Sequence, residues 1–111
     1  MNNFSEALTY VLANTNIKRE NLTFPLTYSK TFGESSVREM DLSERAKNSL
    51  GRGNIHTMND LMQNFDNIAR LRSCGKQTVR EIKNRFLQRW YESLDDEQRT
   101  AFWEEFIVAN S

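Results

Sequence analysis

Polar residues whose types and spacing can do chemistry are concentrated between Asp41 and Leu87. Arg45, Asn48 and Arg52 lie at relative positions 0, 3 and 7, so a helix would place them in one polar stripe. Arginine binds phosphates, and asparagine can hydrogen-bond to the floor of a DNA groove or to the sugar-phosphate edge. We therefore interpret this stripe as a surface that contacts DNA.

A second polar cluster surrounds Gly75, directly before an expected helix. Glycine lets another molecule approach the backbone closely. The amides of Lys76, Gln77 and Thr78 would form a helix N-terminus, which is a favourable place for a phosphate group. The ammonium group of Lys76 and the hydroxyl of Thr78 reinforce this site. The cluster predicts a second contact to the DNA backbone.

Two successive helix-hairpin-helix units are expected to carry these residues. In the first unit, Ser43 or Asp41 can cap the first helix. Gly51 and Gly53 are expected to end it. Its buried face should consist of Leu42, Ala46 and Leu50.

The next helix of this unit should begin after Thr57, because Thr57 and Asp60 have the spacing of a reciprocal cap. The second unit turns at residues 72–75 and opens a long helix at Lys76. The helix after Thr57 should bury Met58, Leu61, Met62 and Phe65, and the long helix should bury Val79, Ile82 and Phe86.

This region resembles the C-terminal domain of the bacterial RNA polymerase alpha subunit over residues 41–87. The family pattern is a leucine-serine-x-arginine helix, a short hairpin, an aspartate-leucine helix and a glycine-lysine-x-serine/threonine turn. The matching residues are Leu42, Ser43, Arg45, Asn48, Leu50, Asn54, Ile55, His56, Asp60, Leu61, Gly75, Lys76, Thr78, Glu81, Ile82 and Lys83. The resemblance implies an all-α fold built on the paired units.

The resemblance also implies roles for single residues. The family arginine that matches Arg45 enters the minor groove of A/T-rich DNA, where a narrow groove concentrates negative potential. Ser49 stands where the family often has cysteine, and Gln77 stands where it usually has a second basic residue; both belong to the predicted DNA surface. Glu81 matches the acidic residue that orients the groove arginine, although Arg85, one helical turn further on, is an alternative partner.

Charge is unevenly distributed along this chain of 111 residues, whose formal net charge is zero. Residues 41–87 contain nine Lys and Arg against five Asp and Glu, whereas residues 88–111 contain two against six. The asymmetry permits a local cationic surface on a neutral protein. A solvated surface without a partner is the alternative explanation of these counts.

We expect neither an enzyme, nor a cofactor, nor a metal site, because the sequence contains no carboxylate cluster, nucleophile-base pair or set of metal ligands. Cys74 is the one cysteine and is interpreted as a small apolar turn residue. His56, the one histidine, is expected to pack or to cap the hairpin.

The flanking segments depart from the family. Apolar residues at helical spacing predict an N-terminal helix that ends near Asn14. Residues 22–28 are expected to be extended or irregular, and residues 31–36 to form a connector. The long helix from Lys76 should reach Tyr91, and another helix should start after Ser93.

This last helix carries a broad apolar face of Phe102, Trp103 and Phe106, beside acidic residues. Such a face must be covered by packing within the domain, by a second copy in a homodimer, or by a protein partner. We divide the sequence into a helix and connector packed on the module (1–40), the alpha-subunit-like module (41–91) and the acidic amphipathic helix (92–111).

The predicted function is DNA binding, with A/T-rich duplexes as ligands, in transcription or its regulation. The alternative is a protein-interaction module that contacts RNA polymerase, a sigma factor or a transcription regulator without binding DNA itself. Neither a signal peptide nor a membrane span is evident, so a cytoplasmic location is expected. Since 40 residues precede the match, we expect a small stand-alone protein.

Overall fold

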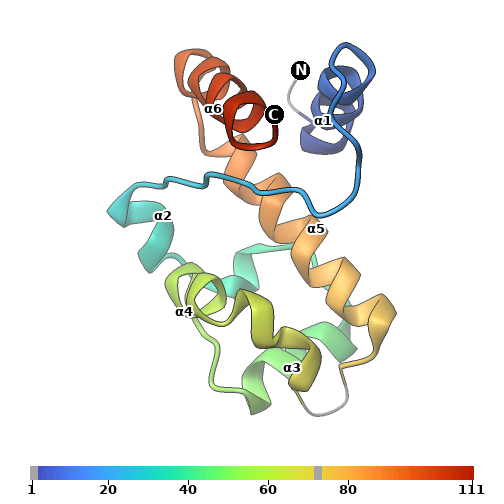
Figure 1. Cartoon of the computed structure of the whole chain (residues 1–111). Coiled ribbons are helices and arrows are strands. Elements are labelled where there is room, and N and C mark those ends of the chain that lie inside the picture. Colours follow the sequence, from blue (N-terminus) through green and yellow to red (C-terminus); the bar gives the residue numbers. More distant parts are fainter. Residues whose placement is uncertain (1–2, 72–73) are drawn as a thin grey trace. The chain divides into compact units, whose positions relative to one another are not determined.

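The computed structural model describes residues 3–71 and 74–111, and this part of the protein is all-α, as predicted. Within those ranges no β-strand forms, and an isolated antiparallel bridge links Ser36 to Thr57. The elements, shown in Figure 1, are the helices α1 (Phe4–Ala13), α2 (Lys30–Glu34), α3 (Glu44–Arg52), α4 (Met58–Gln63), α5 (Lys76–Glu92) and α6 (Asp96–Ala109), and the 3-10 helices η1 (Val37–Glu39) and η2 (Phe65–Arg70). In the described ranges, no helix combines the length and the apolar character needed to cross a bilayer.

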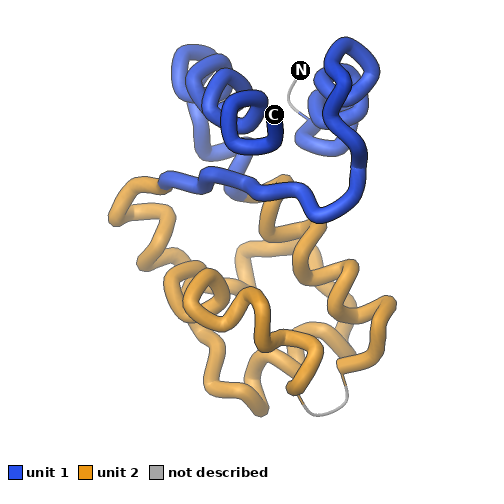
Figure 2. The backbone as a smooth tube through the Cα atoms, in the orientation of Figure 1, with its two compact units in different colours: residues 1–27, 90–111 blue, residues 28–89 orange. Residues whose placement is uncertain are grey.

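The protein folds into two compact units, which Figure 2 draws in different colours. Unit 1 comprises residues 1–27 and 90–111, and unit 2 comprises residues 28–89. Helix α5 begins in unit 2 and ends in unit 1. All residues of the predicted DNA surface belong to unit 2.

A local hydrogen bond caps the start of helix α3. The Ser43 hydroxyl caps it by accepting from the Ala46 amide at 3.2 Å, which confirms one of the two predicted caps. The predicted buried face is also confirmed, since Leu42, Ala46 and Leu50 are at most 6% exposed.

Helix α3 ends at the predicted place, with Gly53 as its C-cap, but by a different geometry. Gly51 lies inside the helix, Gly53 follows it with a negative φ, and the left-handed residue is Asn54, at φ 58°. The Asn54 amide donates to the Gly51 carbonyl, and the Ile55 amide donates to the Leu50 carbonyl at 2.9 Å. This is a Schellman termination, in which asparagine replaces the usual glycine. It turns Ile55, 2% exposed, into the core.

Helix α4 has the predicted reciprocal cap: Thr57 accepts from the Asp60 amide, and Asp60 accepts from the Thr57 amide. The helix is shorter than predicted, because the Asn64 side chain binds the Asp60 carbonyl and the backbone continues into η2. Phe65 therefore belongs to the 3-10 helix. Of the four residues predicted to be buried here, Met58 and Leu61 are buried, and Met62 and Phe65 are half-buried.

The core of unit 2 is centred on Phe86. Its ring centroid lies 5.9 Å from that of Phe32 and 5.5 Å from that of Phe65. Ile68, Ile82 and Phe86 have no exposed surface. Two residues of the predicted stripe on α5 are thus in the core, and the third, Val79, is half-buried.

Residues 31–36 were predicted as a connector, and this was wrong for most of the segment, which forms α2. The Ser29 hydroxyl caps α2 by accepting from the Phe32 amide. Gly33 packs so closely on α4 that an added Cβ would lie 2.5 Å from Oδ1 of Asn59. Burial of Phe32 and this close packing offset the low helix propensity of glycine.

Unit 1 has a core of aromatic side chains. The α1 helix ends one residue before Asn14, as predicted. The ring of Phe4 stacks on Trp103 at 5.6 Å, and the ring of Phe24 stacks on Phe106 at 5.5 Å. The segment around Phe24 is irregular, which was one of the two expected outcomes.

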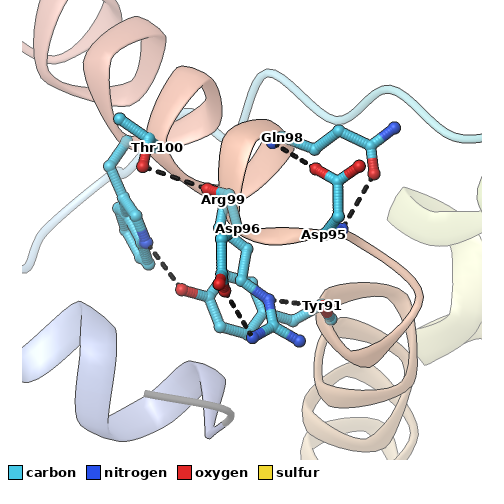
Figure 3. A network of polar contacts seen from close by, with 7 residues as sticks. Tyr91, Asp95, Asp96, Gln98, Arg99 and Thr100 are labelled. Carbon is cyan, nitrogen blue, oxygen red and sulfur yellow. Dashed lines mark hydrogen bonds and ion pairs between the residues drawn. The ribbon is translucent and has the colours of Figure 1, made fainter.

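The start of α6 is fixed by the network in Figure 3. Asp95 and Gln98 form a reciprocal cap, and the Arg99 guanidinium lies 4.7 Å from the Tyr91 ring centroid while donating to the Tyr91 carbonyl. The indole of Trp103 donates to the Tyr91 hydroxyl at 2.9 Å.

Packing within unit 1 therefore covers the aromatic face of α6. Phe102 and Phe106 are 5% and 0% exposed, and Trp103 is half-buried. The homodimer and the partner surface at these residues stay predictions.

Candidate nucleic-acid interface

The exposed face of α3 borders an open hollow. Arg45, Asn48 and Arg52 are exposed along this face, and together with Gly75 they line a depression of about 750 Å³. Leu71 and Cys74 complete its lining. We call this hollow the Arg45 depression. Of the second predicted cluster, Gly75 lines the depression, beside the three residues of the first cluster.

Gly75, the residue directly before α5, lines one edge of the Arg45 depression. The Gly75 carbonyl accepts from the Val79 amide at 2.9 Å, which closes the first turn of α5. The first amides of an α-helix have no partners within the helix and carry partial positive charge. The side chains of Lys76 and Gln77 are exposed beside them. A Cβ added to Gly75 would meet no atom within 4 Å, so the backbone is open to approach there.

Two residues of the predicted DNA surface lie inside unit 2. Ser49 is 0% exposed and Thr78 is 6% exposed. An approaching duplex would meet Asn48 and Gln77, their exposed neighbours, before it met either of them.

Cys74 also lines the Arg45 depression. Partial burial raises the pKa of its thiol, and a hydrogen bond with the Ser49 side chain only partly offsets that increase. A raised pKa favours the neutral thiol over the reactive thiolate. Arg72 and Ser73, which belong to the same predicted turn, lie outside the described residues.

Glu81 joins α5 to the start of α3. Its carboxylate accepts from the Ser43 amide at 2.6 Å and from the Ser43 hydroxyl at 2.7 Å. The carboxylate thus binds Ser43, whereas the two predicted partners were the groove arginine Arg45 and, as the alternative, Arg85. The contact ties α5 to the N-terminus of α3, the helix that carries Arg45.

A second hollow lies against α3 and was missed at the level of sequence. Its volume is about 700 Å³, and its polar lining includes Arg38, Lys47, His56 and the shared residues Asn48 and Arg52. We call it the Lys47 depression. Arg38 comes from η1, and no sequence pattern indicates that η1 packs beside α3. The charge of Lys47 is evident from the sequence, but Lys47 does not belong to the predicted stripe of Arg45, Asn48 and Arg52.

Charge is segregated between the units. Residues 28–89 contain twelve Lys and Arg against seven Asp and Glu, a net charge of +5. The remaining residues include three Lys and Arg against eight Asp and Glu, a net charge of −5. The unit that contains both hollows is therefore the cationic one.

Comparison with known proteins assigns the protein to a family. Residues 28–88 match the family model for the C-terminal domain of the bacterial RNA polymerase alpha chain. The DNA-directed RNA polymerase subunit alpha of Syntrophomonas wolfei subsp. wolfei is 36% identical over 53 residues, which are 47% of this chain and 17% of that subunit. The alignment thus spans less than a fifth of the curated relative's length. No solved structure matches the protein significantly. Since the family model covers more than half of the residues, the protein belongs to the family of the C-terminal domain of the bacterial RNA polymerase alpha chain.

Proposed function

We propose that unit 2 binds duplex DNA at the minor groove, with a preference for A/T-rich sequence. Membership of the family gives the protein a role related to transcription. One observation carries the DNA proposal: two arginines and an asparagine of α3 share an open depression with Gly75, the residue directly before α5.

The chemistry of the Arg45 depression suits a minor groove. A/T-rich DNA has a narrow minor groove with enhanced negative potential, which attracts an inserted guanidinium. Arg45 is the side chain we assign to this insertion. Asn48 can hydrogen-bond to the acceptors on the groove floor, which A·T and T·A pairs share. The resulting sequence preference is for base composition rather than for a defined site.

The start of α5 suits the phosphates beside the groove. Backbone amides at a helix N-terminus bind phosphate, and an exposed lysine adds charge. We assign Gly75, Lys76 and Gln77 to one strand of the backbone, with Thr78 supporting the turn from inside. Glu81 acts as a positioning residue, because it fixes the end of α3 closest to Arg45.

We further propose that the protein acts together with RNA polymerase or with a transcription regulator. This proposal is supported by the similarity to an RNA polymerase alpha subunit and not by any contact in unit 2.

The test is a fluorescence-anisotropy titration of A/T-rich and G/C-rich duplexes at about 50 and about 200 mM salt. Arg45→Ala is compared with Arg85→Ala, which removes an equal charge from an exposed position of α5 outside both hollows. We expect tighter binding to the A/T-rich duplex, weakening with salt, that is lost in Arg45→Ala and kept in Arg85→Ala. A folded wild type that binds neither duplex at low salt would refute the proposal and favour a protein-interaction module. Equal losses in the two variants would point to nonspecific attraction.

A further inference from the structure

The two depressions lie on opposite sides of one ridge. Asn48 and Arg52 line both hollows, whereas Arg45 lines only the Arg45 depression and Lys47 only the Lys47 depression. With about 3.6 residues per turn, Arg45 and Lys47 project on opposite sides of Asn48 around the helix axis. Helix α3 therefore presents a polar ridge with a hollow along each flank.

The dimensions of DNA limit how this ridge can enter a groove. An α-helix with its side chains is about 10–12 Å across, whereas the minor groove of B-DNA is about 6 Å wide. A whole helix cannot enter such a groove, so only its ridge of side chains can. The sugar-phosphate strands that border the groove must then lie against the protein on both sides of the ridge.

We infer that the Lys47 depression binds the sugar-phosphate backbone of one DNA strand while the Arg45 depression and the start of α5 bind the other. Unit 2 would thus span a single minor groove. This inference rests on the proposed function, because it assumes that the ridge of α3 enters the groove. It adds a binding site, with Arg38 and Lys47 as its phosphate ligands.

The lining of the Lys47 depression fits a sugar-phosphate strand. Its charged residues are Arg38, Lys47 and Arg52 against the single carboxylate of Glu44. Lys47 lies 3.7 Å from Glu44, and the two side chains are 43% and 85% exposed. An ion pair this exposed contributes little, so a phosphate can replace the carboxylate as partner of Lys47.

Part of the lining of the Lys47 depression is apolar. This part is formed by side chains of the core, among them Val37 and Ile55, which are 6% and 2% exposed. Apolar atoms between cations suit the alternating chemistry of the DNA backbone, in which deoxyribose carbons separate the phosphates. Continuity with the ridge favours the same duplex as the occupant over an acidic peptide.

The first test counts phosphates through salt dependence. For B-DNA, the slope of log K against log salt is negative, and its magnitude decreases by about 0.9 for each phosphate contact that is lost. We expect Lys47→Gln and Arg38→Gln each to reduce the slope by about 0.9, and the double variant by about twice that. Lys30→Gln is the matched control, because Lys30 also forms an exposed pair with a helical glutamate, at 3.8 Å, but lines neither hollow. Circular dichroism and thermal melting of each variant check that it is folded.

The second test assigns the contacts to strands. Neutral methylphosphonates are placed one at a time along each strand of the A/T-rich duplex, and the affinity loss is measured at each position. Wild type should be sensitive on both strands across one minor groove. The Arg38→Gln, Lys47→Gln double variant should lose that sensitivity on one strand and keep it on the other.

The outcomes separate this inference from the function on which it rests. If wild type binds no duplex, both fail. If wild type binds and Arg45→Ala abolishes binding, but the double variant keeps the wild-type slope and strand pattern, only the inference fails. A slope reduction equal to that of Lys30→Gln would also refute it. Saturable binding of an acidic peptide that competes with DNA only in proteins retaining Lys47 would reassign the hollow to a protein partner.

Discussion

Among single residues, Gly75 is free of the close packing that constrains Gly33 and Gly53. A Cβ at Gly75 would meet nothing within 4 Å, whereas a Cβ at Gly33 would lie 2.5 Å from the Asn59 side chain. The backbone of Gly75 also has no positive φ. The fold therefore tolerates a larger residue at Gly75. A ligand that approaches the backbone there would instead collide with the added side chain.

Gly75→Ala should consequently separate binding from stability. We expect its free energy of unfolding to stay within about 0.5 kcal/mol of wild type. Its affinity for the A/T-rich duplex should fall about tenfold, equivalent to about 1.4 kcal/mol, because the added methyl group holds the phosphate away from the first amides of α5. Urea unfolding and anisotropy titration measure the two quantities. Gly33→Ala is the contrasting control, expected to lose about 1 kcal/mol of stability through overpacking and to keep its affinity. Unchanged binding by Gly75→Ala would remove the start of α5 from the DNA surface.

Glu81 is hydrogen-bonded to the residue that caps α3. Its carboxylate accepts both hydrogen bonds that Ser43 can donate, and Ser43 in turn caps α3. Glu81→Gln replaces one acceptor with an NH₂ donor that faces another donor. We expect a loss of about 1 kcal/mol in unfolding free energy, below the range of about 1.5–3 kcal/mol for bonds to charged groups, because the contact is exposed.

DNA affinity should also fall in Glu81→Gln, since the N-terminus of α3 is released. Arg85→Ala, which leaves the Ser43 contact intact, is the control for both measurements. If Arg85→Ala is as destabilising as Glu81→Gln, an ion pair between Glu81 and Arg85 would contribute more to the unfolding free energy than the contact with Ser43.

At the scale of elements, the helix starts that depend on nearby residues were predictable. Ser43 caps α3, and Thr57 and Asp60 cap α4, through contacts that span three residues. The stripe of Arg45, Asn48 and Arg52 followed from helical periodicity in the same way. The sequence therefore predicted those features whose interacting residues lie within about one or two helical turns of each other.

Features that depend on distant partners were not predictable. Helix α2 is a five-residue helix stabilised by burial of Phe32 against Phe86, which lies more than fifty residues away in the sequence. The contact between Ser43 and Glu81 spans 38 residues. The Lys47 depression exists only because η1 packs beside α3. Spacing within the sequence holds no information about such contacts.

The cap of α4 should make part of the stability depend on pH. Backbone hydrogen bonds from His56 and then Thr57 lower the pKa of Asp60 below its ordinary value. A carboxyl group whose pKa is lower in the folded state binds fewer protons there than in the unfolded state, so stability rises with pH. The contribution is complete above the ordinary aspartate pKa of about 3.9 and is lost as the pH falls through the lower folded-state value.

Asp60→Asn should remove this dependence, because the amide keeps one acceptor oxygen and cannot titrate. The difference in unfolding free energy between wild type and variant should be largest at neutral pH and should shrink as the pH falls below about 3.9. Urea unfolding at a series of pH values measures it. A difference that is constant with pH would mean that the charge of Asp60 does not contribute to the cap.

For the whole molecule, the opposite net charges of the two units bear on DNA binding. Unit 2 has a net charge of +5 and unit 1 a net charge of −5. The family match ends at residue 88, so it leaves the acidic C-terminal segment outside. A duplex bound as proposed would be attracted by unit 2 and repelled by unit 1, and this repulsion needs no contact between the acidic residues and DNA.

Reducing the acidity of unit 1 should therefore strengthen DNA binding, but only at low salt. Glu104 and Glu105 are exposed on α6, and replacing both with glutamine changes the charge of unit 1 from −5 to −3. In water, two unit charges about 15 Å apart interact by about 0.3 kcal/mol, so each substitution should raise affinity by less than about twofold. At about 0.1 M salt the screening length is about 10 Å, and the gain should shrink further as salt is raised. Anisotropy titration across a salt series measures the gain, with Glu104→Asp, Glu105→Asp as the control that keeps both charges. A gain that persists at high salt, or that also appears in the aspartate control, would show that α6 touches the duplex or alters the fold instead of acting through its charge.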